Sequence, residues 1–320
     1  MMKQTDSPME QMPAIDPARG CCVTIGNFDG VHKGHQALIS HAREFARKVG
    51  MPCVVVTFWP HPRLVLGREH VPVMTRAARR EALQALQPDY IWEIPFNRLV
   101  AALSPEEFLR QYLTPLTMRR LVVGHDFSLG KGRVGQPVVL QGLGRAYGYT
   151  MEQLAPVMEG GSVVSSSRIR HFVDQGGVDL AARMLGRLHF CDGEVVRGEG
   201  RGEGLGFPTA NMDLPETLLP PEGVYASRLS VGGTCYAAVT NLGSNPTFGG
   251  RKVGVESFVL DAPGDLDLYG RRVRVHFVKQ LRRERQFSGP EELAAQIARD
   301  VEQARGILPD AQPFIAPADR

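Results

Sequence analysis

The sequence lacks any hydrophobic run long enough to cross a membrane. Its longest apolar stretch runs from Cys53 to Trp59, whereas a membrane span needs ~18–20 consecutive apolar residues. The segment from Met1 to Asp16 is polar and has no hydrophobic core, so it predicts a ragged tail and not a signal peptide. We therefore expect no membrane partner.

The sequence also lacks an excess of either charge. Lys and Arg number 37 against 34 Asp and Glu, which gives a net charge of +3, and no basic block occurs. Aromatic residues make up only 7% of the chain. Proteins that bind nucleic acid usually carry a basic patch or stripe with aromatic side chains. The composition therefore gives no support for nucleic acid as a partner.

Cysteine is scarce, and its spacing is uninformative for metal binding. The five cysteines contain no C-x-x-C motif, and two of them are adjacent, which suits neither a zinc site nor an ordinary disulfide. We expect buried thiols in a reducing compartment, and hence a cytoplasmic protein. The residues are Cys21, Cys22, Cys53, Cys191 and Cys235.

The remaining composition is that of an ordinary globular protein. It has 320 residues, of which 43% are hydrophobic and 22% charged. At roughly 100–200 residues per domain, this length favours two domains, each with its own core.

The first half alternates short apolar strands with segments of helical periodicity. Strand–helix–strand repetition predicts a doubly wound parallel sheet of the Rossmann-like α/β kind. Ser104-Pro105-Glu106-Glu107 is a capping box that opens one of the helices. The predicted strands are Val23–Ile25, Cys53–Phe58, Tyr90–Ile94 and Leu121–Val123, and helices are expected near residues 38–49 and 75–86.

The second half changes character after about Gly186. Short alternating strands are separated by glycine turns, among them the two-glycine hairpin Val231-Gly232-Gly233-Thr234. An apolar stripe at Leu293, Ile297 and Val301 predicts a final helix. The pattern indicates an antiparallel β-barrel with a terminal helix. The predicted strands are Glu194–Arg197, Val224–Val231, Tyr236–Thr240, Val253–Leu260 and Val273–Val278.

One loop of the first half has the composition of a phosphate site. It lies between the first strand and the first helix, at the sheet edge where ligands of open α/β folds bind. The helix N-terminus favours phosphate, and His32 and His35 are three residues apart, so both imidazoles can face it. The alternatives are a tight turn with two solvated histidines and a zinc half-site. The candidate residues are Gly26, Asn27, Phe28, Asp29, Gly30, His32 and His35.

Two better-known phosphate motifs do not fit. Residues 124–132 resemble a P-loop, but the glycine spacing is one residue too long and no Ser or Thr follows Lys131. The glycines between 198 and 206 stand at every second position and lead into Phe207-Pro208 instead of a helix.

The second half carries its own polar cluster. A glycine-rich loop, residues 198–206, lets the backbone approach a polyphosphate. Thr209 and Asn211 alternate in the sequence, so in an extended segment both side chains point one way and offer oxygen atoms to Mg²⁺.

Four segments of the first half, in order, resemble the bacterial bifunctional riboflavin kinase/FAD synthetase family. They are the H-x-G-H loop at 26–35, Thr57-Phe58-Trp59-Pro60-His61-Pro62, the segment from Gly124 to Gly135, and Ser165-Ser166-Ser167-Arg168-Ile169-Arg170. Residues 187–305 are similar to the riboflavin kinase module throughout. The resemblance spans about nine-tenths of the chain.

The resemblance implies roles for both halves. In the first half, Ser166 and Arg170 join the loop around ATP, and the flavin site comprises Phe58, Pro60, His61, Pro62, Asp126, Phe127 and Arg133. In the second half, Glu256 is the base that takes the proton of the riboflavin 5′-hydroxyl. There ATP and Mg²⁺ are held by Gly204, Gly206, Pro208, Thr209 and Asn211, and the flavin by Glu256, Arg282 and Phe287.

The expected substrates are riboflavin, FMN and ATP, with ATP as co-substrate and Mg²⁺ as cofactor, in a monomer or weak homo-oligomer. The resemblance also implies domain limits: a tail at 1–18, the FMN adenylyltransferase at 19–170, a helical linker at 171–186, the kinase at 187–305 and a tail at 306–320.

Alternatives stay open from the residues alone. Phe58 and Phe127 are also compatible with the core, Glu256 with an outward-facing edge position, and Arg282 with a solvated charge. Rival functions are an H-x-G-H transferase for another phosphorylated substrate and a flavin-binding protein without catalysis.

The sequence departs from the family pattern at three places. Trp59 stands where an acid is common, Leu129 where an aromatic is usual, and Ser257-Phe258 where an aliphatic residue and a histidine are frequent.

Overall fold

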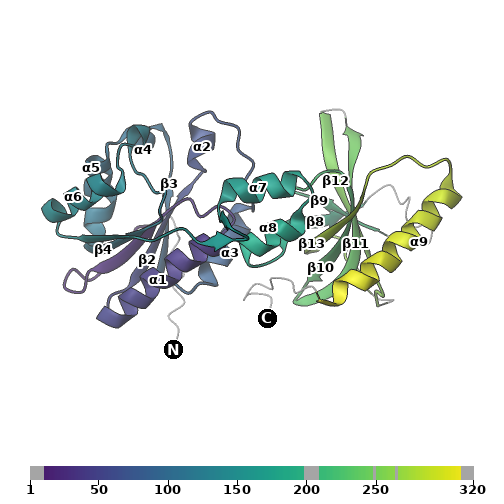
Figure 1. Ribbon diagram of the computed structural model, residues 1–320, viewed down its shortest axis with the longest axis horizontal. Coiled ribbons are helices and arrows are strands. Elements are labelled where there is room, and N and C mark those ends of the chain that lie inside the picture. Colours follow the sequence, from purple (N-terminus) through teal and green to yellow (C-terminus); the bar gives the residue numbers. More distant parts are fainter. Residues whose placement is uncertain (1–10, 198–208, 248–249, 264–265, 311–320) are drawn as a thin grey trace. The chain divides into compact units, whose positions relative to one another are not determined.

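The structure is a computed structural model that describes residues 11–197, 209–247, 250–263 and 266–310 (Figure 1). The chain forms two compact units. The first comprises residues 1–70 and 79–164, and the second comprises 71–78 and 165–320. No helix within the described residues is long and apolar enough to cross a membrane.

The first unit contains a five-stranded parallel sheet in the order β3-β2-β1-β4-β5, which confirms the predicted α/β fold. The sequence analysis missed β5 because three of its four residues are polar and none of the four is fully buried at the sheet edge. The strands are β1 (Cys21–Ile25), β2 (Cys53–Trp59), β3 (Tyr90–Pro95), β4 (Met118–Val123) and β5 (Thr150–Gln153).

Both faces of this sheet are covered. Every residue of β1 is buried. Val23 and Ile25 belong to the core that contains Phe108 and Leu140, whereas the buried side of α1 packs on β1 from outside that core. The helices are α1 (Lys33–Val49), α2 (Pro62–Val65), α3 (Arg76–Gln84), α4 (Arg98–Ala102), α5 (Pro105–Phe108) and α6 (Pro137–Tyr147), and a short hairpin pairs β6 (Met158–Glu159) with β7 (Ser162–Val163).

The predicted capping box is present at α5. The Glu107 amide donates to Ser104 Oγ at 3.2 Å, and the Ser104 amide donates to Glu107 Oε2 at 2.8 Å. These bonds satisfy two backbone N–H groups that a helix start leaves without partners. The bond from the Ser104 amide also holds the pKa of the Glu107 carboxyl below its usual range.

The second unit contains a closed antiparallel barrel in the order β10-β11-β12-β9-β8-β13, which confirms the predicted barrel. Gly232 and Gly233 both have positive φ, as a tight two-residue hairpin turn requires. The strands are β8 (His189–Val196), β9 (Thr209–Asp213), β10 (Gly223–Val231), β11 (Thr234–Thr247), β12 (Gly250–Val259) and β13 (Arg272–Arg283), and the helices are α7 (Ser166–Asp174), α8 (Val178–Leu185) and α9 (Pro290–Ile307).

Two packed side chains lie in segments that the sequence assigns to tails. Ile15 packs against the core of the first unit, and Leu308, only 3% exposed, packs with Ala304 beside the barrel. The domain limits given above remain predictions.

The cysteines are free thiols, as expected, and four of them are buried. Cys235 is the exception, because it is only partly buried. Burial raises the pKa of Cys21 and Cys22 to about 12, so these thiols stay protonated and unreactive.

Candidate active sites of the two domains

The candidate nucleotide loop follows β1 at the carboxyl edge of the sheet. The strand order reverses between β1 and β4, and ligands of open α/β sheets bind at such a reversal. The loops after β1, β2 and β4 therefore meet at the binding edge, and each carries one of the predicted segments.

His32 and His35 form a stacked pair at the start of α1. Their ring centroids lie 3.5 Å apart with planes at 17°. His32 is the N-cap, and its Nδ1 accepts the His35 amide at 3.3 Å. Since Nδ1 uses its lone pair in this bond, the proton of the neutral His32 ring lies on Nε2, which makes Nε2 a donor.

The backbone around the pair is constrained. Phe28 is fully buried with φ of 49°, and Val31 has φ of 39°. Residues other than glycine rarely adopt such positive φ angles. These angles persist where the surrounding structure holds the backbone in place, as is common at ligand sites. A Cβ at Gly34 would lie 3.1 Å from the His32 ring, so the glycine of H-x-G-H makes room for the first histidine.

The predicted flavin segment after β2 lies largely inside the domain. Phe58 is 7% exposed and packs edge-on against Phe96 and Phe108. Its side chain is therefore part of the core. Pro60 follows a cis peptide bond and is exposed, and Pro62 begins α2.

His61 joins a buried cluster that the sequence did not reveal. Its ring stacks on His70 at 3.7 Å, and His70 Nε2 lies 3.5 Å from the Asp29 carboxylate of the nucleotide loop. The three side chains each place a possible metal ligand within 4.8 Å of the others. Within the described residues, this group of possible metal ligands includes neither His32 nor His35. It therefore gives no support to a zinc half-site at those two histidines.

Two features of the cluster argue against a metal ion. The stacked His61 and His70 rings are only 14° from parallel, so their in-plane lone pairs run side by side and do not converge. His61 Nδ1 accepts the Arg63 amide at 3.2 Å, which leaves the proton of the neutral ring on Nε2. The cluster therefore ties the loop after β2 to the loop after β1 through Asp29.

The loop after β4 holds the other predicted flavin residues. Asp126 is exposed, and Phe127 is half-buried against the core. Arg133 donates from Nε to Ser128 Oγ at 2.6 Å and from Nη2 to the Asp126 carbonyl at 3.1 Å. The guanidinium is thus held within the loop while remaining exposed to solvent.

Ser166 and Arg170 lie on α7 in the second unit, four residues apart as predicted. The N-cap is Ser165, whose Oγ accepts the Arg168 amide at 3.3 Å. Arg170 Nε donates to the Val71 carbonyl at 3.1 Å.

In the barrel, strand register brings the predicted kinase residues together. Asn211 of β9 pairs with Glu256 of β12, and Thr209 pairs with Phe258. Cross-strand partners share a face, so Thr209, Asn211 and Glu256 lie on one side of the sheet. Asn241 of β11 also pairs with Glu256. Gly204, Gly206 and Pro208 lie outside the described residues.

Glu256 is half-buried, and its neighbours along the strand face the other way. Val255 and Ser257 are buried in the barrel interior. Ser257 Oγ pairs with Thr240 Oγ1 at 2.8 Å, and Thr240 pairs with Ser227 at 2.7 Å. This chain of hydroxyls satisfies three buried polar groups next to the site.

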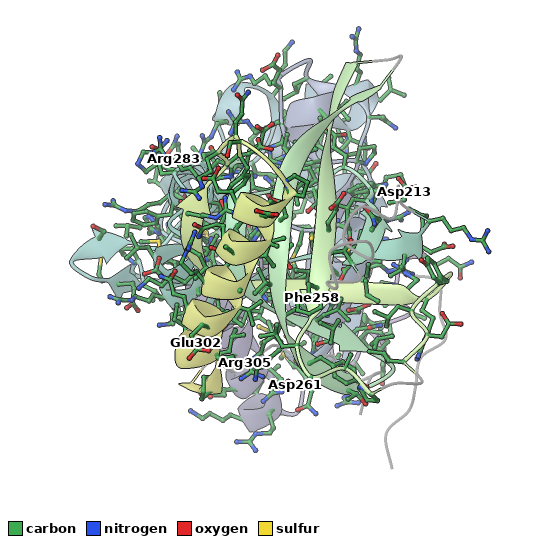
Figure 2. The ribbon with its side chains drawn as sticks, turned by 90° about the vertical axis from the view of Figure 1, so that its right-hand side faces the viewer. Asp213, Phe258, Asp261, Arg283, Glu302 and Arg305 are labelled. Atoms are coloured by element: carbon green, nitrogen blue, oxygen red, sulfur yellow. The ribbon has the colours of Figure 1, made fainter. Side chains whose placement is uncertain are left out.

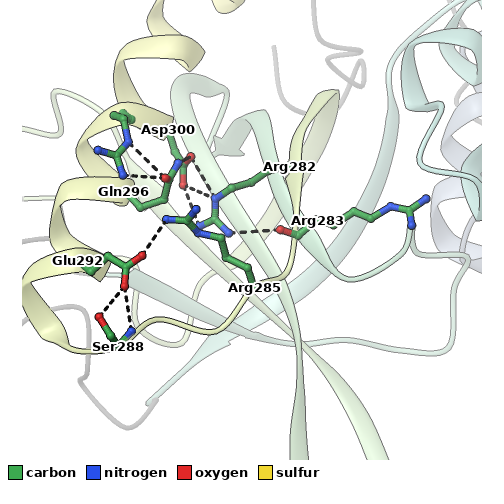
Figure 3. A network of polar contacts seen from close by, with 8 residues as sticks. Arg282, Arg283, Arg285, Ser288, Glu292, Gln296 and Asp300 are labelled. Carbon is green, nitrogen blue, oxygen red and sulfur yellow. Dashed lines mark hydrogen bonds and ion pairs between the residues drawn. The ribbon is translucent and has the colours of Figure 1, made fainter.

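Arg282 is engaged with α9. Its guanidinium pairs with Asp300 at 2.9 Å, and its Nε bonds both carboxylate oxygens (Figure 3). Phe287 is half-buried, and its ring centre lies 5.4 Å from the Arg282 guanidinium and 4.6 Å from that of Arg285. Arg282 is therefore paired and is not the solvated charge that the sequence allowed as an alternative.

The residues that depart from the family pattern make identifiable contacts in the structure. The Arg79 guanidinium lies 5.6 Å from the centre of the Trp59 ring. Leu129 is 7% exposed and pairs with Gly135 across the loop. Ser257 joins the hydroxyl chain described above.

The fold is an α/β domain followed by a barrel, and the family matches identify the chain as a two-domain transferase that uses nucleotides. The sequence matches the family described as FAD synthetase over residues 14–168 and the family described as riboflavin kinase over residues 185–308.

Relatives and a solved structure resemble the whole chain. Bifunctional riboflavin kinases/FMN adenylyltransferases are 38% identical in Escherichia coli (strain K12) and 39% in Pseudomonas fluorescens, each covering 90% of this chain and 93% of the relative. The relative from Bacillus subtilis is 35% identical, covering 88% and 90%. A crystal structure of a macrolide-efflux protein from Streptococcus pneumoniae has a TM-score of 0.82 at 29% identity, covering 92% and 98%.

The chain belongs to the bifunctional riboflavin kinase/FMN adenylyltransferase family. The resemblance inferred from the motifs is thereby confirmed, and with it an enzyme that joins a kinase to a nucleotidyltransferase.

Proposed function

We propose that the α/β domain adenylylates FMN at the loop of residues 26–35. The stacked histidine pair at the start of α1 is the observation that carries this assignment. His32 Nε2 and the helix N-terminus donate hydrogen bonds to the α-phosphate of ATP as negative charge builds there. An FMN phosphate oxygen forms a bond to that phosphorus, and the bond to pyrophosphate breaks. Ser166 and Arg170 bind the departing phosphates, and the segment 58–62 with Asp126, Phe127 and Arg133 binds the flavin.

We propose that the barrel phosphorylates riboflavin at the face shared by Thr209, Asn211 and Glu256. The register of β9 against β12 supports this assignment. Glu256 accepts the proton of the 5′-hydroxyl, whose oxygen bonds to the γ-phosphorus of ATP while ADP leaves. The hydroxyl of Thr209 and the amide oxygen of Asn211 are hard oxygen donors and fit Mg²⁺, which would neutralise phosphate charge. Arg282 and Phe287 flank the flavin in this assignment.

A time course tests both assignments. Purified protein is given riboflavin, ATP and Mg²⁺, and the flavins are separated by chromatography. FMN followed by FAD is expected. FMN alone would refute the adenylyltransferase assignment, and unchanged riboflavin together with unchanged added FMN would leave a flavin-binding protein.

We also propose that the chain works in the cytoplasm as a monomer or weak homo-oligomer. The free thiols support a reducing compartment. Sedimentation at several concentrations measures the oligomeric state, and a stable large assembly would contradict the proposal.

A further inference from the structure

A buried ion pair lies beneath the two loops of the adenylyltransferase site. Arg79 of α3 is 4% exposed and Glu93 of β3 is 1% exposed, with Arg79 Nη2 at 2.7 Å from Glu93 Oε2. Removing two charges from water is costly, and replacing such a pair by apolar residues is often neutral or stabilising. A buried pair is thus weak evidence for stability, and its other contacts indicate its role.

Arg79 also donates to two backbone carbonyls. Nη1 donates to the Asn27 carbonyl at 3.0 Å, and Nη2 donates to the Phe58 carbonyl at 2.9 Å. Asn27 belongs to the candidate nucleotide loop and Phe58 begins the candidate flavin segment. One guanidinium therefore bridges the backbone of both segments.

The Asp29–His70–His61 contacts also join these two loops, and a hydroxyl reaches the same Asn27 carbonyl as Arg79 does. Thr57 Oγ1 donates to the same Asn27 carbonyl at 3.3 Å, a longer bond than that from Arg79. The next residue after Asn27 is Phe28, which is held at φ of 49°. A planar guanidinium has donors at fixed separation, so it sets a distance between two acceptors that a lysine ammonium does not.

We propose that Arg79, oriented by Glu93, is a positioning residue for adenylyl transfer. It fixes the spacing between the nucleotide loop and the flavin segment, and so aligns the FMN phosphate with the α-phosphate of ATP. The inference rests on the proposed function, because it takes residues 26–35 as the ATP loop and residues 58–62 as flavin-binding.

Three variants of the full-length enzyme test it. Arg79→Lys keeps the charge but loses the fork, so the kcat of FAD formation should fall about 100-fold, the size of effect expected for a misplacement near 1 Å. The KM for ATP and for FMN should both rise. Thr57→Val removes a donor to the nucleotide loop alone and should raise only the KM for ATP. Arg43→Lys is the matched control, because Arg43 bonds the Leu86 carbonyl elsewhere in the domain.

Riboflavin phosphorylation in the same samples reports on the barrel and should not change. Arg79→Lys kinetics equal to those of Arg43→Lys would overturn the inference. The inference would also be overturned if Arg79→Lys left both KM values unchanged and lowered kcat only in proportion to the unfolded fraction measured by tryptophan fluorescence. Such a result would be a purely structural effect. Wild-type enzyme that makes no FAD would instead refute the proposed function.

Discussion

At the scale of single residues, the imidazole of His32 has two nitrogens with different tasks. Nδ1 caps α1 by accepting the His35 amide. This bond orients the ring and leaves Nε2 as the donor. His35, stacked on it and in edge contact with Phe28 at 5.2 Å, has no capping task of this kind. Substitutions can therefore distinguish the roles of the two histidines.

His35→Ala should lower FAD formation by about 10²–10³-fold, the effect of removing one donor to a developing charge. His32→Asn should do the same while retaining an N-cap side chain, so that folding is preserved. Riboflavin phosphorylation should be unchanged in both variants. Flavin chromatography with FMN or riboflavin as the starting flavin measures the two activities, and loss of both would contradict separate sites.

Glu256→Gln should give the opposite pattern. The amide keeps the size of the side chain but accepts no proton, so FMN formation should fall by about 10²–10⁴-fold, the usual contribution of a general base. FAD formation from supplied FMN should persist. If Glu256→Gln phosphorylates riboflavin at the wild-type rate, Glu256 is not the base.

At the scale of elements, α9 is attached to the barrel by ion pairs of two kinds. Asp300 is 2% exposed and binds Arg282 of β13, with Gln296 donating to it at 2.7 Å (Figure 3). Asp261 and Arg305 form the second pair at 2.7 Å in the last turn of the helix, where both are exposed (Figure 2). Water screens the second pair but barely reaches the first.

Asp300→Asn should therefore lower the free energy of unfolding of the barrel domain by about 3 kcal/mol, because it leaves Arg282 without its buried counter-charge. Asp261→Asn is the control, since asparagine also tolerates the left-handed backbone at that position, where φ is 50°. It should leave the unfolding midpoint nearly unchanged. Urea unfolding followed by circular dichroism compares them, and equal effects would show that burial does not separate the two pairs.

At the scale of the whole molecule, the barrel carries its own sensitivity to acid. Burial lowers the pKa of His189 to about 4 and, with help from Arg274, Arg187 and Arg228, that of His276 to about 3. Both rings are neutral in the folded domain and bind protons on unfolding below their ordinary pKa near 6.5. The stability they contribute is complete above pH 6.5 and is lost as the pH falls toward 4.

The free energy of unfolding of the barrel should fall by about 1.4 kcal/mol per pH unit for each histidine in that window. His276→Gln should remove one such contribution from the slope. Unfolding at pH 7, 6 and 5 measures the slopes. Trp59 and Trp92 both lie in the first unit, so fluorescence identifies its transition. If the free energy of unfolding of His276→Gln depended on pH as steeply as that of the wild type, His276 would not be buried in its neutral form.

Local patterns in the sequence were sufficient for much of this architecture. Apolar runs predicted β1 to β4, and the capping box at Ser104 formed as expected, because such features depend on neighbours along the chain. The polar edge strand β5 lacked this signal. His32 and His35 were found because their spacing on one helix turn is itself local.

Tertiary structure decided which distant groups meet. The Arg79–Glu93 pair and the Asp29–His61–His70 cluster join segments far apart in sequence, and the clearest clue to them was a charge at Glu93 within an otherwise apolar strand. Register across β9 and β12 placed Glu256 beside Asn211. The sequence by itself determined the family, the two folds and the reactive residue types, because these are written in local periodicity and motifs. Which carbonyls, rings and charges share one buried space depends on how separate elements pack, and only the folded chain settles that.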